Sequence, residues 1–144
     1  MLISLRQLVS VFLFALLAVA CSTSTPENVP ERVDQLIAEN EYEQALDMLD
    51  GAGTQESTDT INQLREKVYL NYGMFLEYTG EEGTGMRERM TGALEQFVEV
   101  LKINPDNQQA IDEVEQIMGI YSTMPEKSPG EDIMADLREL GFDY

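Results

Sequence analysis

The chain of 144 residues is long enough for one small domain and a targeting segment. Its 27 acidic and 9 basic side chains give a formal net charge of −18. Such a surface repels nucleic-acid phosphates and anionic lipids, whereas it attracts basic proteins. The absence of histidine and the presence of a single cysteine exclude an intramolecular disulfide, zinc sites built from Cys and His, and every Ser-His-Asp arrangement. We expect no metal and no cofactor.

The first twenty residues have the pattern of a secretory signal peptide. Met1–Gln7 carry one cationic side chain, Arg6, and Leu8–Ala20 are apolar or small except for Ser10. As a helix, this apolar run of thirteen residues would span about 20 Å, which is less than the roughly 30 Å hydrocarbon core of a bilayer. An uncleaved membrane anchor is the alternative, and the short run argues against it. We predict a signal peptide over residues 1–20.

The single cysteine follows this run directly, in the sequence LAVAC at residues 17–21. This segment resembles the lipobox of bacterial lipoproteins, although Ala18 stands where leucine is usual. The resemblance implies that the Cys21 thiol receives a diacylglyceryl group, that a peptidase cuts before Cys21, and that the new amino group is acylated. Two or more acyl chains hold a protein on a membrane where one does not. The expected partner of Cys21 is therefore a membrane.

The residues after Cys21 predict a location and a tether. Ser22 rather than aspartate follows the cysteine, which in Gram-negative bacteria of the enteric type resembles the signal for transfer to the outer membrane. The expected location is then the periplasmic face or the surface of the outer membrane, and otherwise the outer face of the cytoplasmic membrane. Residues 21–30 contain two prolines and several hydroxyl side chains, a composition typical of a flexible or partly extended linker.

From Glu31 onward, apolar residues recur at helical spacing and no stretch alternates convincingly at period two, so we predict an all-α domain over residues 31–144. Breaks that are polar or contain glycine or proline separate about six apolar stripes. We expect Asp106 to cap the N-terminus of the fifth helix, with Gln109 completing a capping box, and Gly141 to follow the sixth. The six stripes begin at Val33, Tyr42, Ile61, Met86, Ala110 and Ile133.

Helices of this kind with short connectors form either a closed bundle or a stack of helical hairpins. Weak internal similarity favours the stack, because two segments share a spacing. In residues 39–52, Ala45 precedes Leu49 by four positions, and in residues 86–106, Ala93 precedes Phe97 by four.

The second of these segments resembles the second helix of a tetratricopeptide repeat. That family packs a small residue, an aromatic residue four positions on, a small residue three further, and a proline five further. Those positions here hold Ala93, Phe97, Val100 and Pro105. Val100 is larger than the usual alanine. The preceding helix supplies the first half of the repeat through Tyr69, Tyr72, Gly73 and Leu76.

The resemblance covers roughly residues 31–121 and has two further departures. About eight extra residues lengthen the turn between the two helices of the better repeat, and Asn40 replaces the usual glycine in the first, poorer repeat. The resemblance implies a short tetratricopeptide-like stack whose last helix acts as a cap. An unrelated helical bundle is the alternative.

Tyrosines are the candidate partner-binding residues, since concave faces of helical stacks often hold a partner segment with such side chains. The alternative is that they fill the core with the hydroxyl group at its edge. The candidates are Tyr69, Tyr72, Tyr78 and Tyr121.

These features predict a membrane-anchored envelope lipoprotein that acts as a protein-protein interaction module or scaffold and has no catalytic residue. Tetratricopeptide-like lipoproteins of bacterial envelopes are associated with outer-membrane protein assembly and pilus biogenesis, and the resemblance implies that class. One alternative is a small envelope hydrolase that uses carboxylates, which requires a concave site with an acid of raised pKa. The other is a structural helical-bundle lipoprotein unrelated to tetratricopeptide repeats.

Overall fold

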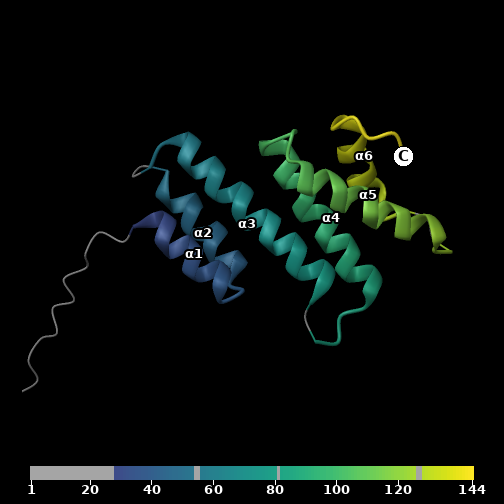
Figure 1. The fold of residues 1–144 in the computed structure, drawn as a ribbon, viewed down its shortest axis with the longest axis horizontal. Helices are drawn as coiled ribbons and strands as arrows, with labels where there is room; N and C mark the ends of the chain where they lie inside the picture. The colour runs from purple at the N-terminus through teal and green to yellow at the C-terminus, as the bar shows by residue number, and fades with distance from the viewer. Residues whose placement is uncertain (1–27, 54–55, 81, 126–127) are drawn as a thin grey trace, which may run out of the picture.

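The computed structural model describes residues 28–53, 56–80, 82–125 and 128–144. These residues form six helices and no strand, so the predicted all-α class is confirmed (Figure 1). The predicted signal peptide, Cys21 and most of the predicted tether lie outside the described residues. The helices are α1 (Val29–Ala38), α2 (Tyr42–Ala52), α3 (Thr58–Tyr78), α4 (Met86–Ile103), α5 (Gln108–Thr123) and α6 (Glu131–Glu139).

The helices form a short stack along the long axis of the molecule. Two antiparallel hairpins, α1 with α2 and α3 with α4, follow one another, and α5 and α6 both pack on α4 (Figure 1). Helix α3 contacts α1 and α2 on one side and α4 on the other. The stack of helical hairpins expected from the sequence is therefore present, with α3 as the element common to both ends.

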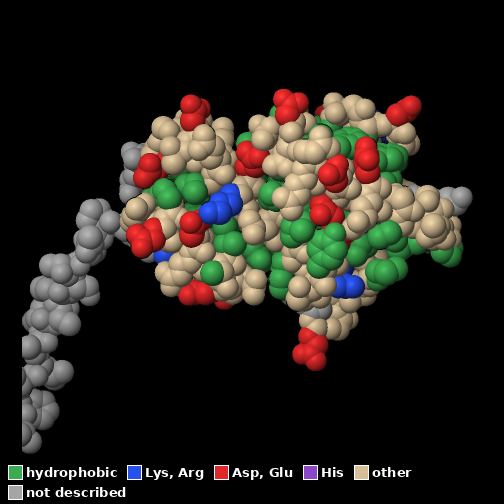
Figure 2. Space-filling view, in the orientation of Figure 1, with side chains coloured by type: hydrophobic (Ala, Val, Ile, Leu, Met, Phe, Trp, Pro, Cys, Tyr) green, Lys and Arg blue, Asp and Glu red, His purple; other side chains and the backbone are tan. Residues whose placement is uncertain are grey.

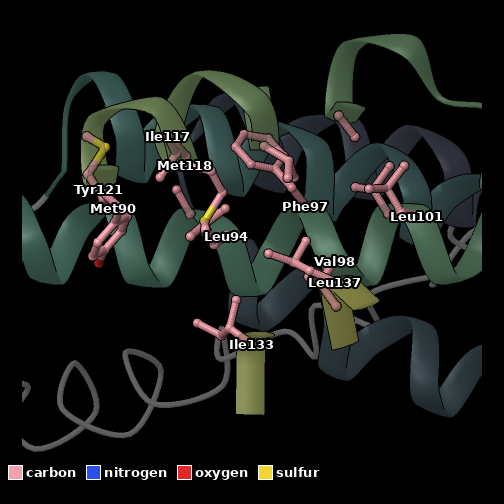
Figure 3. Packing of buried hydrophobic residues seen from close by; sticks show 14 residues of the cluster. Met90, Leu94, Phe97, Val98, Leu101, Ile117, Met118, Tyr121, Ile133 and Leu137 are labelled. Atoms are coloured by element: carbon pink, nitrogen blue, oxygen red, sulfur yellow. The ribbon is translucent and has the colours of Figure 1, made fainter. Parts of the chain in front are cut away.

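Buried apolar side chains form two clusters that share α3. The first lies between α1, α2 and the N-terminal half of α3, to which α3 contributes Ile61, Leu64 and Val68. The second lies between α4, α5 and α6, and the next turns of α3 cover it (Figure 3). Its buried members are Met90, Ala93, Leu94, Phe97, Val98, Val100, Leu101, Ala110, Val114, Ile117, Met118, Tyr121, Ile133 and Leu137.

Gly73 of α3 lies against the ring of Phe97 of α4, and both residues were nominated from the sequence. Gly73 is buried, and the Phe97 ring has no exposed surface. A Cβ atom added to Gly73 would lie 2.6 Å from a ring carbon of Phe97, which is well inside van der Waals contact. Gly73 therefore allows the two long helices to approach each other at the centre of the stack.

The residues at both ends of helix α1 explain where the helix begins and ends. It begins at Val29, two residues before the predicted start at Glu31, because Val29 is buried and Pro30 suits a first helical turn, where no intrahelical N–H donor is needed. The helix ends at Ala38, and Asn40 two residues later lies in the left-handed region, at a φ of 60°. The Asn40 N–H donates to the Ile37 carbonyl at 3.1 Å. Asn40 thus adopts the left-handed conformation that the expected glycine usually adopts after a helix.

The turn between α4 and α5 corrects the predicted cap. The Asn107 side chain, not that of Asp106, accepts a hydrogen bond from the Ala110 N–H at 3.0 Å and caps α5. The Asn107 amide also donates to the Glu66 carboxylate at 2.8 Å, and Asn104 donates to the same oxygen at 2.7 Å. Glu66 on α3 therefore holds the turn through Asn104 and Asn107. The Asn107 side chain can donate to Glu66 and accept from Ala110 at the same time, whereas the Asp106 carboxylate can only accept.

Two further helix ends are closed by neighbouring groups. Gly141 follows α6 with a φ of 94°, and its N–H donates to the Arg138 carbonyl at 3.1 Å, as predicted for a glycine in this place. At the end of α3, the Arg89 guanidinium donates to the Thr79 carbonyl at 3.1 Å. A cation interacts favourably with the negative end of the helix dipole at a C-terminus. Arg89 therefore stabilises the end of α3, where the lengthened turn to α4 begins.

Candidate partner-binding groove

Helices α2, α3, α4 and α6 line an open groove of about 520 Å³. Each helix contributes at least one apolar or aromatic side chain to it: Leu46 from α2, Tyr69 and Tyr72 from α3, Val98 from α4 and Ile133 from α6. The groove spans both core clusters, because Leu46 and Tyr72 pack on the first cluster and Val98 and Ile133 belong to the second.

The aromatic part of the groove is held in place by stacking. The Tyr72 ring lies parallel to the Tyr42 ring, with centroids 4.9 Å apart and an interplanar angle of 11°. Tyr42 is buried, and its hydroxyl donates to the Asn40 amide oxygen at 3.1 Å. The Phe75 ring also packs on the Tyr42 ring, at a tilt, with the two centroids 5.6 Å apart. A rigid aromatic surface of this kind loses little conformational entropy when a partner covers it.

Carboxylates surround this apolar floor. Five acidic side chains line the groove, and no basic side chain is among its lining residues: Glu43, Glu95, Glu99, Asp132 and Asp136.

Two of these five carboxylates are paired and three are not. The Lys102 ammonium donates to Glu99 at 2.9 Å and to Asp136 at 3.1 Å, and so bridges α4 and α6 at the edge of the groove. Glu43, Glu95 and Asp132 are exposed and have no ion-pair partner within the described part of the chain. Burial raises the pKa of Tyr69, and the negative charge of Glu99 raises it further.

The four tyrosines nominated by the sequence fall in three different places. Tyr69 and Tyr72 lie together in the groove. Tyr78 is 57 % exposed at the C-terminal end of α3, where its hydroxyl donates to Glu113 at 2.9 Å. It therefore lies outside the groove.

Tyr121 is fully buried between α4 and α5 (Figure 3). Its hydroxyl lies 2.6 Å from the Thr91 hydroxyl, and the Arg87 guanidinium lies 5.1 Å from the centre of its ring. This placement leaves Tyr121 no surface to offer a partner. It follows the alternative interpretation, in which the ring fills the core and the hydroxyl reaches the edge.

The residues nominated for repeat packing are buried with one exception. Gly73 lies against Phe97, and the proline lies in the exposed turn after α4, beside a second cavity of about 270 Å³. The fully buried members are Ala45, Leu49, Ala93, Phe97 and Val100; the exposed one is Pro105.

The sequence reasoning missed Glu77, the one charged side chain that is buried among the described residues, with 4 % of its surface exposed. The Gln116 amide donates to one carboxylate oxygen at 2.7 Å, and the other oxygen is buried with no hydrogen-bond partner in the described residues. Burial raises the pKa of Glu77 to about 7; the Gln116 bond opposes this rise and the charge of Glu113 adds to it. The available signal was its position four residues after Gly73, about one helical turn, which places Glu77 on the same face of α3 as that glycine.

Glu77 lines neither the groove nor the smaller cavities beside Pro105 and beside Asn40. Within the described residues, no group of three or more Cys, Asp or Glu side chains is placed to hold a metal ion, and no helix has the length and apolar character needed to cross a membrane.

Comparison of the chain with models of protein families, with curated proteins and with solved structures found no match.

Proposed function

We propose that the protein is a lipid-anchored envelope protein that binds another protein through the groove between α2, α3, α4 and α6, without catalysing a reaction. One observation carries this proposal: Tyr69 and Tyr72, nominated from the sequence as partner-binding residues, lie together in a groove with an apolar floor and a carboxylate rim. Interface hot spots are enriched in tyrosine and lie in such partly apolar, well-packed surroundings.

The anchor rests on the resemblance of LAVAC to a lipobox, and the domain on the resemblance of residues 31–121 to tetratricopeptide repeats. Val29 follows Cys21 by eight positions, so covalent geometry limits the distance between the two residues to about 29 Å. A lipid on Cys21 would thus keep the groove within reach of partners at the same membrane. The short tether suits a scaffold that acts at the envelope.

The anchor is tested by metabolic labelling with radioactive palmitate. We expect the wild-type protein and a Ser22→Ala control to incorporate the label, because both keep the thiol that receives the lipid. A Cys21→Ser variant should incorporate none and should be released from the membrane fraction or mis-sorted. Label that persists in Cys21→Ser would contradict the lipoprotein assignment.

Binding is tested by affinity purification from detergent-solubilised envelopes. We expect one stoichiometric partner whose recovery falls about tenfold or more in Tyr69→Ala, because this loss corresponds to the roughly 1.4 kcal/mol or more that a hot-spot tyrosine contributes. Tyr78→Ala is the matched control, since it removes an exposed tyrosine outside the groove. Loss of the partner in Tyr78→Ala alone would place the interface elsewhere, and turnover of a cell-wall or sugar substrate without a partner would favour an enzyme.

A further inference from the structure

We infer that the groove recognises a positively charged segment of its partner, in which a lysine or arginine side chain lies between Glu95 of α4 and Asp132 of α6. This inference rests on the proposed function, because it names the chemistry of the partner for the same groove. It goes further than the net charge, since it identifies the carboxylates that would bind and the position of the cation.

The contact between α4 and α6 repeats after one helical turn. Residue numbers rise in the same direction along both helices in Figure 3, from Met90 to Leu101 on α4 and from Ile133 to Leu137 on α6. Glu95 precedes Glu99 by four residues on α4, and Asp132 precedes Asp136 by four on α6. A step of four residues is about one turn, so each helix presents two carboxylates on the same face.

One of the two carboxylate pairs already holds a cation. Lys102 donates to both Glu99 and Asp136, and the hydrogen bond to Glu99 is the main cause of its raised pKa. One turn earlier on α4, the residue equivalent to Lys102 is Val98, which is buried in the floor of the groove. Glu95 and Asp132 therefore correspond to Glu99 and Asp136. At this position, however, the apolar side chain of Val98 stands in place of the Lys102 ammonium.

The rest of the groove suits the same kind of partner. Lysine and arginine bury their alkyl stems on apolar surface while the charged group reaches carboxylates, and aromatic rings attract such cations. Leu46, Tyr69 and Tyr72 supply the apolar and aromatic surface, and Glu43 on α2 supplies a further unpaired carboxylate. Because the three unpaired acids come from α2, α4 and α6, a segment that crosses the helices can contact all three.

Other occupants fit these features less well. A second copy of the chain would bring a further formal charge of −18 to an acidic groove. Acidic side chains are spread over the face of the molecule in Figure 2, with few basic ones among them. The segment that precedes α1 contains a single basic side chain, Arg6, within the predicted signal peptide. A basic segment of another protein is therefore the occupant that charge complementarity favours.

The inference is tested with an array of random 12-residue peptides, probed with the full-length protein in detergent at physiological salt. We expect the bound peptides to be enriched in lysine and arginine, and the affinity for the best of them to fall as salt rises. In the variant Glu43→Gln/Glu95→Gln/Asp132→Asn, that affinity should fall about tenfold or more, as removal of several complementary charges predicts.

The matched control is Glu82→Gln/Asp106→Asn/Asp112→Asn, which changes the net charge by the same amount at three exposed positions outside the groove. It should bind within about twofold of the wild type, because a general charge effect falls off beyond a Debye length. Equal losses in the two variants, no enrichment in basic residues, or self-association through the groove would overturn the inference.

The two proposals fail in different ways. Recovery of a native partner could depend on Tyr69 and yet be unchanged in Glu43→Gln/Glu95→Gln/Asp132→Asn. That result would overturn the inference and leave the proposed function in place. The absence of any native partner, with the peptide result intact, would overturn the proposed function and leave only the preference of the groove for basic segments.

Discussion

At the scale of single residues, Gly73 is the position where one methyl group should matter most. We expect Gly73→Ala to lower the free energy of unfolding by about 1–3 kcal/mol, the usual cost of overpacking a buried contact, because the new Cβ would press on the fully buried Phe97 ring. Chemical denaturation of the two proteins measures the difference.

Gly119→Ala is the control for that experiment. Gly119 lies in α5, is exposed, and has no atom within 4 Å of an added Cβ. Alanine there should stabilise the helix by about 0.5–1 kcal/mol, because glycine is the poorer helix former. A Gly73→Ala variant as stable as the wild type would show that α3 and α4 do not pack as described.

Glu77 should make stability depend on pH. Burial raises its pKa from an ordinary value of 4.5 to about 7, so the folded state holds the proton more tightly than the unfolded state. The stabilisation is fully present below about 4.5 and is lost as the pH rises through about 7. We expect Glu77→Gln to be the more stable protein at pH 8, by at most about 3 kcal/mol, and to approach the wild type near pH 4.

Denaturant titrations of wild type and variant at a series of pH values check this expectation, with Glu88→Gln as a control at an exposed carboxylate on the same molecule. The groups around Glu77 are Gln116 and Glu113 on α5, Tyr78 on α3, and Arg89 on α4, whose guanidinium lies 3.5 Å from the backbone carbonyl of Glu77. A difference between wild type and Glu77→Gln that does not change with pH would contradict the burial of an ionisable carboxyl.

At the scale of the elements, the start of α5 tests how the turn after α4 is built. Asn107→Ala should cost about 1–2 kcal/mol of unfolding free energy, because it removes the cap and the bond to Glu66. Asp106→Ala is the matched control one residue away, at an exposed side chain that does not cap the helix. Equal losses in thermal or chemical denaturation would contradict the assignment of Asn107.

The elements themselves were predictable because each carries a strong local signal. Apolar residues at helical spacing located all six helices. The resemblance to a repeat nominated Gly73 and Phe97 as packing residues, and the structure places them against each other. The cap of α5 was missed because Asp106 and Asn107 are both good caps in isolation, and only the distant Glu66 distinguishes them. Tyr69 and Tyr72 could be nominated from the sequence, whereas Tyr121 could not be recognised as buried without the position of α4.

At the scale of the whole molecule, the groove exists because α3 joins two core clusters. The acids that line it come from α2, α4 and α6, which are up to 93 residues apart in the sequence between Glu43 and Asp136. Helical spacing describes one helix at a time. The acidic composition was therefore visible in the sequence, whereas the gathering of these five carboxylates around two tyrosines was not. That arrangement follows from the order in which the helices stack.

Site-specific photo-crosslinking in native envelopes tests most directly whether the groove contacts a partner protein. A photoreactive amino acid at Gln96, which lines the groove, is compared with the same group at Gln63, an exposed position on α3 outside the groove. The proposed role of the groove predicts a defined protein adduct from position 96 and none from position 63. An adduct from position 63 alone, or none from either position while the protein is present and folded, would contradict it.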